Sequence, residues 1–406
     1  MRIKDIVVRE ILDTRGDKTI EVSVTDEDLR SFYAQIPSGR SRGKNEAAVL
    51  PPQEAESAAA KIERAVQGAD FDSVEALDKK LLTLDGTPNK EKLGGNVMLG
   101  VSLAFARALA FERKEELWQV LSDEFFGGKK FPGRPLIFSN LVNGGQHAQD
   151  GLPIQEYMVV VRPRGSYVKT VGKLLKFYEL LGDTLRRKTG EEELPLGDEG
   201  GYAIPFEDAF GPLQVLQDLI TENNLGDQFR LGLDAAASSF YDRGAYDFGG
   251  LKLDAETLRR TYEDWFDWAP ELLSIEDPFD ENKPEDFAAL RKALAGFTDE
   301  KWVVGDDLTV TNPTRIKKYA GEGALNAVII KANQVGTLTE TCEAMRLAAS
   351  LGVKRIVSHR SGETEDNFLI HLAKASGAEG VKIGAPHESR MSKYNELLRL
   401  YADEIA

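Results

Sequence analysis

The sequence predicts an α/β barrel preceded by a smaller α+β domain. Between residues 229 and 384, six short apolar segments end on or beside a charged side chain, and stretches with helical periodicity separate them. The ends of these segments recur at intervals of roughly 25 to 40 residues, which is typical of a barrel where a helix follows each strand. Each segment is apolar enough to be buried on both faces, as parallel strands are. A chain of 406 residues is long enough for both units.

The α+β domain is predicted for residues 1–130. Residues 1–36 are β-branched or alternate in the way that antiparallel strands do, and a turn at Arg15-Gly16-Asp17 separates the first two of three strands. Helical periodicity then predicts three helices that cover this sheet. They are expected at 53–67, 73–82 and 96–113.

The barrel is predicted for residues 131–406, because residues 126–135 are rich in Gly, Pro and Lys and indicate a boundary. Its first two strands are expected at 136–140 and 153–161, with helices after them at 167–188 and 206–221. Two later helix starts are marked by Asn312-Pro313 and by Thr337 with Glu340. The remaining strands are expected to end at Asp234, Glu276, Asp306, Lys331, His359 and Lys382.

Charge and cysteine content limit the partners and the compartment. The net charge of −16 argues against nucleic acid and anionic membranes as partners, because both need cationic surface. Cys342 is the only cysteine and the N-terminus has no apolar signal region, so we expect a cytoplasmic protein. The longest apolar stretch, at 97–111, contains Ser102 and Arg107 and is too short to cross a membrane.

Three carboxylates are expected to converge at the barrel mouth. Asp234, Glu276 and Asp306 end consecutive predicted strands, and the carboxyl ends of such strands meet at one face of a barrel. Converging anions repel one another unless a cation neutralises them, and oxygen ligands suit Mg²⁺. The alternative is that each carboxylate only caps its strand or pairs with a neighbour. Three in series favour the metal site.

Lysine follows the carboxylates around the predicted barrel. Beside a divalent cation, the pKa of Lys331 should fall, which would leave a neutral amine as general base. It could instead bind phosphate or balance the carboxylates. Base, metal and anion-binding groups on one mouth suggest proton abstraction next to a carboxylate, with Glu199 and Glu156 placed to act as general acid. The groups expected to bind an anion are His359, Arg360, Ser361 and Lys382.

Three other reactive side chains give weaker signals. His371 lies on a helical pattern and is interpreted as structural, and Cys342 is interpreted as core filling within a helix. His387 lies in a loop after the last predicted strand, and its role is open.

At these residues the sequence resembles the enolase (phosphopyruvate hydratase) family over nearly its whole length. Ten motifs occur in the family's order, which makes the resemblance very specific. They lie at 11–16, 99–104, 143–147, 155–156, 197–201, 274–278, 305–309, 331–336, 358–366 and 382–386.

The resemblance implies a dehydration of 2-phosphoglycerate to phosphoenolpyruvate. Lys331 would remove the proton at C2, and Glu199, helped by Glu156, would assist departure of the C3 hydroxyl. Enolase-superfamily sites use a Lys or His base with one or two Mg²⁺ ions. The implied Mg²⁺ ligands are Asp234, Glu276 and Asp306, with Ser41 for a second ion. The implied substrate contacts are His147, Gln155, His359, Arg360 and Ser361, the latter two on the phosphate, and Lys382 on the carboxylate.

The resemblance also implies the architecture and the assembly. An enolase-type barrel has an antiparallel second strand, and such proteins are usually homodimers or octamers of dimers. From the resemblance we also expect two Mg²⁺ ions per active site, a small phosphorylated substrate and a homo-oligomeric assembly.

The sequence departs from the family in the polar loop at 37–43. Arg40 and Arg42 stand where the family usually has Ala and Thr. These guanidinium groups could pair with an additional anionic group on a larger substrate, or they could point to solvent. The alternative function is therefore a paralogue that dehydrates a bulkier, more anionic analogue, such as a carboxylated phosphonate that gives carboxyphosphonoenolpyruvate.

Two further alternatives are weaker. A non-catalytic scaffold would need neither Lys331 and Glu199 nor the three carboxylates. Barrel relatives of the racemase and muconate-cycloisomerase type usually carry a Lys-x-Lys base on the second strand, and residues 155–162 contain no lysine.

Overall fold

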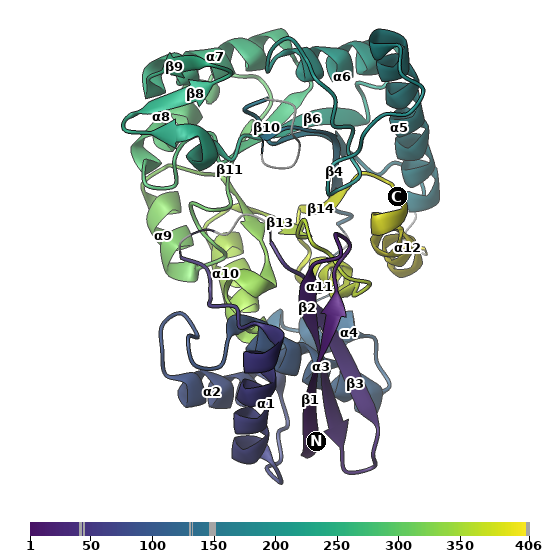
Figure 1. Ribbon diagram of the computed structural model, residues 1–406, viewed down its shortest axis with the longest axis vertical. Helices are drawn as coiled ribbons and strands as arrows, with labels where there is room; N and C mark the ends of the chain where they lie inside the picture. Colours follow the sequence, from purple (N-terminus) through teal and green to yellow (C-terminus); the bar gives the residue numbers. More distant parts are fainter. Residues whose placement is uncertain (40–42, 44, 130, 132, 146–151, 403–406) are drawn as a thin grey trace.

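A closed barrel of eight strands and a separate three-stranded sheet organise the chain (Figure 1). The computed structural model describes residues 1–39, 43, 45–129, 131, 133–145 and 152–402. The N-terminal sheet and its helices form the lower part of the view, and the barrel with its outer helices forms the upper part. The predicted fold class, an α/β barrel with an N-terminal α+β domain, is confirmed.

The N-terminal sheet is antiparallel in the order β1-β2-β3, as predicted. Asp13 stabilises the first turn, because its Oδ1 accepts hydrogen bonds from the backbone amides of Arg15 and Asp17 at 2.8 and 3.0 Å. Three of the helices were predicted, and a fourth, α4, was not. The elements are β1 (Ile3–Leu12), β2 (Lys18–Asp26), β3 (Ser31–Ile36), α1 (Pro52–Val66), α2 (Val74–Asp85), α3 (Gly95–Arg113) and α4 (Leu117–Phe125).

The barrel closes in the order β10-β11-β12-β13-β14-β4-β5-β6. Its second strand, β5, runs antiparallel to both neighbours, whereas the other pairings are parallel, which confirms the expected enolase-type arrangement. The strands are β4 (Leu136–Asn143), β5 (Glu156–Val161), β6 (Phe229–Asp234), β10 (Leu272–Glu276), β11 (Trp302–Gly305), β12 (Ala327–Ile330), β13 (Lys354–Ser358) and β14 (Gly380–Gly384).

Helices surround the barrel, and three of the four whose starts were predicted begin at the predicted place. The side chains of Asn312 and Thr337 accept backbone hydrogen bonds at the starts of α9 and α10. Helix α6 begins five residues later than predicted, because Asp208 holds a turn by accepting the amides of Phe210 and Gly211 at 2.9 Å. The helices are α5 (Tyr167–Thr189), α6 (Gly211–Glu222), α7 (Ala255–Trp268), α8 (Pro284–Leu294), α9 (Pro313–Gly321), α10 (Leu338–Ser350), α11 (Phe368–Ser376) and α12 (Met391–Leu400).

A small hairpin sheet between β6 and α7 was not predicted. Its strands are β7 (Tyr241–Asp242), β8 (Ala245–Phe248) and β9 (Leu251–Leu253). Short 3₁₀ turns follow β6, β12 and β14, at η2 (Ala237–Phe240), η3 (Ala332–Gln334) and η4 (Glu388–Arg390).

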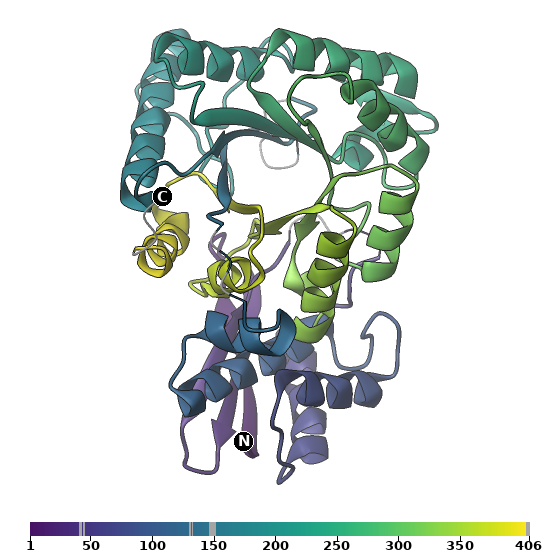
Figure 2. The ribbon, with the colours of Figure 1, turned by 180° about the vertical axis from the view of Figure 1, so that it is seen from behind.

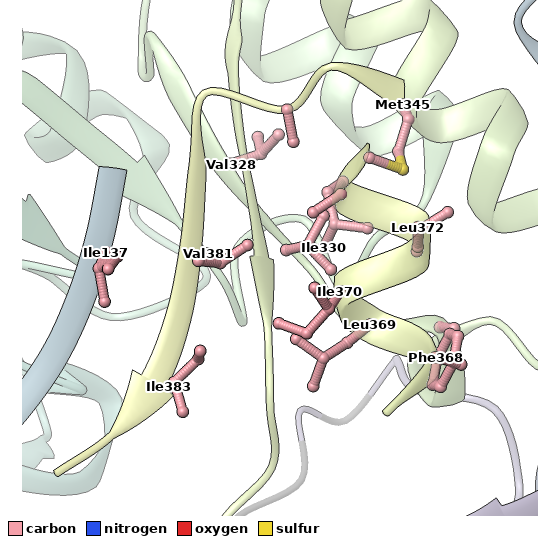
Figure 3. Packing of buried hydrophobic residues seen from close by; sticks show 14 of the residues in the cluster. Ile137, Val328, Ile330, Met345, Phe368, Leu369, Ile370, Leu372, Val381 and Ile383 are labelled. Carbon is pink, nitrogen blue, oxygen red and sulfur yellow. The ribbon is translucent and has the colours of Figure 1, made fainter. Parts of the chain in front are cut away.

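Alternate residues of each barrel strand point inward and outward, which divides the apolar core into two layers. The outward layer packs against the helices: Figure 3 shows Leu369 and Ile370 of α11 beside Ile330 of β12 and Val381 of β14. The inward layer fills the inside of the barrel behind the carboxyl ends of the strands, so the barrel is a packed core and not an open channel. It consists of Phe138, Met158, Val160, Trp302, Val304, Ala327, Ile329 and Ile356.

The two parts of the chain pack on each other through helices and through ion pairs, one of which joins Arg107 and Asp366. Seen from behind (Figure 2), α4 lies between the N-terminal sheet and the barrel, where it contacts α11. Arg107 of α3 donates to both carboxylate oxygens of Asp366 at 2.7 and 2.5 Å. Among the described residues, no helix is long and apolar enough to cross a membrane.

Candidate active site

The ends of the barrel strands carry the charged side chains that the sequence predicted there. Asp234 and Glu276 are the last residues of β6 and β10. Asp306 and Lys331 directly follow β11 and β12. The other predicted residues at strand ends belong to β13 and β14: His359, Arg360 and Ser361 follow β13, and Lys382 is the third residue of β14.

The twofold periodicity of the strands directs these side chains into the barrel. On β12, Ala327 and Ile329 belong to the inward layer, and Lys331 continues that series. On β14, Val381 and Ile383 pack outward among the helices (Figure 3), so Lys382 between them points inward. The apolar inward layer therefore ends in a charged layer at the mouth, where the barrel fold places reactive groups.

The antiparallel direction of β5 brings its first residue to the same mouth. Glu156 opens β5 and lies opposite Asp234, the last residue of β6. The Gln155 amide donates to the Asp234 carbonyl at 3.0 Å, and the Gln155 side chain is buried beside the site. A parallel second strand would have placed Glu156 at the far end of the barrel.

Lys382 lies among three of the carboxylates. Its Nζ is 2.9 Å from Glu156 Oε2, 2.9 Å from Glu276 Oε2 and 3.2 Å from Asp234 Oδ2. Burial opposes the charged ammonium, but the three carboxylates outweigh it and raise the pKa of Lys382 well above its usual range. The lysine predicted as a substrate contact is thus also the main neutralising charge of the site.

Asp306 and Lys331 form a buried ion pair at the ends of adjacent strands. Gln334 Nε2 donates to the other Asp306 oxygen at 2.9 Å. Burial lowers the pKa of Lys331, but the neighbouring carboxylates, Asp306 first and then Glu276, together raise it above its usual value. Lys331 is thus paired with a predicted metal ligand, and the fall of its pKa expected beside a divalent cation stays a prediction.

The carboxylates have the chemistry of an Mg²⁺ site but are paired with lysines. Among the described residues, no three Asp, Glu, His or Cys side chains are grouped to hold a metal ion. Burial and then repulsion by Asp234 raise the pKa of Glu276 well above its usual range, so this set of oxygens favours added positive charge. Gln155 Oε1 is buried and accepts no hydrogen bond from the described residues. The donors fit a hard cation that would displace the ammonium groups.

Glu199 faces this cluster from a separate loop. An isolated bridge between Leu196 and Tyr202 closes the loop, and Glu199 is 2% exposed. Asn140 Nδ2 donates to Glu199 Oε2 at 3.1 Å, and His359 Nε2 lies 3.3 Å from the same oxygen. Burial, followed by repulsion from Glu199, raises the pKa of Glu156 to about 8. Two carboxyl groups thus share one side of the site, where a proton can be held near neutral pH.

Arg360 has a partner that sequence reasoning missed. Its Nη1 and Nη2 donate to Glu46 Oε2 and Oε1 at 3.1 and 3.2 Å, across 314 positions of the chain. Ser361 Oγ is 3.4 Å from Arg15 Nη1, which links the same loop to the N-terminal domain. No local pattern marks Glu46, because its role depends on where the two domains meet.

The enclosed space at the mouth is small. A cavity of about 30 Å³, room for roughly one or two waters, is lined by ten of the predicted residues. The loop residues Asp277 and Asp307 also line it and were not predicted. The ten are Gln155, Glu156, Glu199, Asp234, Asp306, Lys331, His359, Arg360, Ser361 and Lys382.

Four predicted site residues lie outside the described residues: Arg40, Ser41, Arg42 and His147. Their roles stay predictions. The structural interpretations of His371 and Cys342 fit the packing: His371 Nε2 is 2.8 Å from Glu396 Oε1, and Cys342 is buried in α10.

Comparison with known proteins decides the family. A model described as the enolase C-terminal TIM barrel domain matches residues 133–406, and one described as the enolase N-terminal domain matches residues 3–121. The chain belongs to the enolase family. An enolase of Methanopyrus kandleri is 41% identical over 99% of this chain and 96% of its own length. Enolases of Methanosarcina barkeri and Lactobacillus delbrueckii subsp. bulgaricus are 39% and 38% identical, and the alignments cover 99% and 98% of this chain and 95% of each relative.

Membership of the enolase family confirms the predicted enzyme class, a lyase of the phosphopyruvate hydratase type. The relatives do not favour the alternative of a paralogue with a bulkier substrate. The family implies Mg²⁺ as cofactor. The boundary predicted at residue 130 stays a prediction, and the two matched segments leave residues 122–132 between them.

Proposed function

We propose that this enolase-family chain dehydrates 2-phosphoglycerate to phosphoenolpyruvate with Lys331 as base and Glu199 as acid. The observation that carries the proposal is their placement across one barrel mouth. Lys331 follows β12, while Glu199 comes from a loop that pairs with β4, and both line the same cavity. A substrate between them would have its C2 proton toward the lysine and its C3 hydroxyl toward the carboxyl group.

The charge environment of Lys331 supports its role as base. Burial and the positive charges of Arg360 and Lys382 lower its pKa, and Asp306 is the main group that raises it. Once Asp306 is shared with a cation, the influences that favour a neutral amine dominate. A neutral amine at this position can accept the C2 proton.

The acid side of the site supports a proton donor to the C3 hydroxyl. Asn140 Nδ2 donates to Glu199 Oε2 at 3.1 Å, and His359 Nε2 lies 3.3 Å from the same oxygen. Glu156, whose pKa burial raises to about 8, can keep one proton within this carboxyl pair at neutral pH. The pair thereby offers a proton to the departing hydroxyl group.

The residues proposed to hold Mg²⁺ are Asp234, Glu276 and Asp306, with Ser41 for a second ion. Bound there, Mg²⁺ would supply the positive charge that stabilises the anion formed when the C2 proton is removed. Lys382, released from these carboxylates, would bind the substrate carboxylate, and Arg360 with Ser361 would bind the phosphate. Gln155 and His147 complete the proposed contacts.

The test is formation of the enol product, followed by absorbance with 2-phosphoglycerate and Mg²⁺, beside an EDTA control. Chelator-sensitive turnover that is lost in Lys331→Ala and Glu199→Gln supports the proposal. Wild-type turnover in either variant would show that its role is wrongly assigned. Folded protein that binds Mg²⁺ but does not turn over 2-phosphoglycerate would overturn the substrate.

We also propose a cytoplasmic homo-oligomer, either a dimer or an octamer of dimers. Cys342 as the single cysteine supports a reducing compartment, and membership of the enolase family supports oligomerisation. Light scattering during gel filtration distinguishes monomer, dimer and octamer.

A further inference from the structure

We propose that Glu46 is a specificity-determining residue of the anion subsite. It pairs with Arg360, so that only an anion able to displace the Glu46 carboxylate binds the Arg360 guanidinium group. This inference rests on the proposed function, because it takes Arg360 as the phosphate contact. It adds a residue that neither the sequence motifs nor the charged ends of the barrel strands indicated.

The pair has the geometry of a strong, specific interaction. Two guanidinium nitrogens of Arg360 meet the two carboxylate oxygens of Glu46 at 3.1 and 3.2 Å. The side chains are only 4% and 5% exposed, so water screens them little. A parallel, two-point pair of this kind is the arrangement that Arg also forms with phosphate. Glu46 therefore takes the donors that a phosphate group would need.

Neighbouring groups fix both members of the pair. Glu46 Oε1 accepts the Gly43 amide at 3.2 Å. Asn333 Oδ1 accepts from Arg360 Nη1 at 3.0 Å, and Asn333 Nδ2 donates to the Pro37 carbonyl at 3.0 Å. The guanidinium thus keeps its position when it changes partner, because Asn333 holds it independently of Glu46.

Two cavities meet at Arg360 and give the displaced carboxylate a place to go. Arg360 lines both the active-site cavity and a second cavity of about 380 Å³ at the domain junction. Glu46 lines the second cavity together with the polar side chains of Lys18 and Gln53, and the cavity has room for water. An anion that enters from the barrel mouth can therefore take Arg360 while Glu46 turns toward polar groups, without leaving a bare carboxylate in an apolar core.

The exchange makes the subsite selective for charge. A phosphate ester carries about −1.5 to −2 charges near pH 7 and has three acceptor oxygens, so it competes well against one carboxylate. Chloride and nitrate carry a single charge and compete poorly. The subsite should consequently ignore the monovalent anions of its surroundings and still bind a phosphorylated substrate.

Glu46→Gln tests this, because the amide keeps the shape and an acceptor for Gly43 but removes the negative charge. Binding of inorganic phosphate and of nitrate is measured by calorimetry on the full chain in Mg²⁺, independently of turnover. We expect nitrate to bind the variant at least tenfold more tightly than the wild type, with a smaller gain for phosphate. Turnover by the variant should become sensitive to chloride.

The matched control is Glu116→Gln, which removes a glutamate partner of another arginine, Arg399, on the surface. It should leave anion binding and turnover as in the wild type. Glu46→Asp provides a second variant that retracts the carboxylate from Arg360, and it should also raise nitrate affinity. An unchanged ratio of phosphate to nitrate affinity in both Glu46 variants would overturn the proposal.

The same measurements separate this inference from the function on which it rests. Arg360→Gln should abolish the phosphate binding seen in the wild type, and unchanged binding would refute Arg360 as the subsite. If the wild type does not turn over 2-phosphoglycerate but Glu46→Gln shows relaxed anion selectivity, the role of Glu46 is supported and the proposed substrate is overturned. If the wild type turns over 2-phosphoglycerate but Glu46→Gln keeps the wild-type selectivity, the substrate is supported and the role of Glu46 is overturned.

Discussion

The Nε2 atom of His359 lies 3.3 Å from Oε2 of Glu199, and each of these residues is only 2% exposed. The other ring nitrogen, Nδ1, accepts the Gly384 amide at 3.3 Å, so a neutral imidazole carries its proton on Nε2, toward Glu199. Burial lowers the pKa of His359 although Glu199 opposes this, which keeps the ring neutral. The histidine is thereby placed to orient the proposed acid.

The first prediction is that His359 and Glu199 act as one unit. Glu199→Gln should reduce kcat by roughly 10²- to 10⁴-fold, the range typical of a lost acid or base. His359→Asn should reduce it less, because the carboxyl group remains. The double variant should be only slightly worse than Glu199→Gln, since the histidine has nothing left to orient. Steady-state kinetics of the four proteins measure this coupling.

Circular dichroism of the same proteins is the control for folding, because both residues are buried. If the reduction in kcat of the double variant equals the product of the two single reductions, the residues are not coupled and His359 has a separate role.

The second prediction concerns Lys382, whose Nζ contacts Glu156, Asp234 and Glu276. Lys382→Met removes the ammonium and leaves buried carboxylates without it, so the free energy of unfolding in EDTA should fall by roughly 3–5 kcal/mol. Mg²⁺ should then raise the thermal midpoint more in the variant than in the wild type, because the cation no longer competes with a lysine. Scanning calorimetry with and without Mg²⁺ measures both effects.

Lys252→Met is the matched control, since Lys252 pairs with Asp247 on the surface and is 61% exposed in its side chain. It should change neither stability nor the response to Mg²⁺. Equal stabilisation of wild type and Lys382→Met by Mg²⁺ would place the metal away from these carboxylates.

The strand ends show which parts of the site are predictable from sequence. Asp234, Glu276 and Asp306 each follow a short apolar run, and both the register and the inward direction follow from a twofold period. The position of Glu156 needed the antiparallel direction of β5, which the family resemblance supplied and the residues alone did not. The twofold period was therefore sufficient for Asp234, Glu276 and Asp306, and Glu156 needed the resemblance as well.

Contacts between distant segments were not predictable in the same way. Lys382 was expected to meet the substrate, but it lies among the carboxylates because the barrel brings β14 opposite β6 and β10. Glu46 meets Arg360 only because the N-terminal domain packs over the mouth. Neither contact has a local sequence signal, since each depends on how complete elements pack.

The third prediction concerns the ion pair of Arg107 and Asp366 between the domains. Asp366 is 3% exposed in its side chain and accepts two hydrogen bonds from Arg107. Arg107→Met leaves this carboxylate buried without its counter-ion, and the unfolding free energy should fall by roughly 3 kcal/mol. Urea denaturation measures the loss. The control is Arg399→Met, whose own side chain is 49% exposed, so it should cost about 1 kcal/mol or less. Equal losses would refute a special role for the buried pair.

The fourth prediction is a pH dependence that comes from Asp78 of α2. Its Oδ2 accepts the Thr339 amide and hydroxyl at 2.9 and 2.7 Å, and burial raises its pKa from the usual 3.8 to about 7. Between these values the folded state binds more protons than the unfolded state, so this group's stabilising contribution is complete below pH 4 and is lost as pH rises through 7. Asp78→Asn cannot ionise. Its stability relative to the wild type should therefore rise by roughly 2–3 kcal/mol between pH 5 and pH 8. Urea denaturation at both pH values measures the difference, with exposed Asp264→Asn as control. A difference that does not change with pH would mean that the Thr339 hydrogen bonds keep Asp78 ionised throughout.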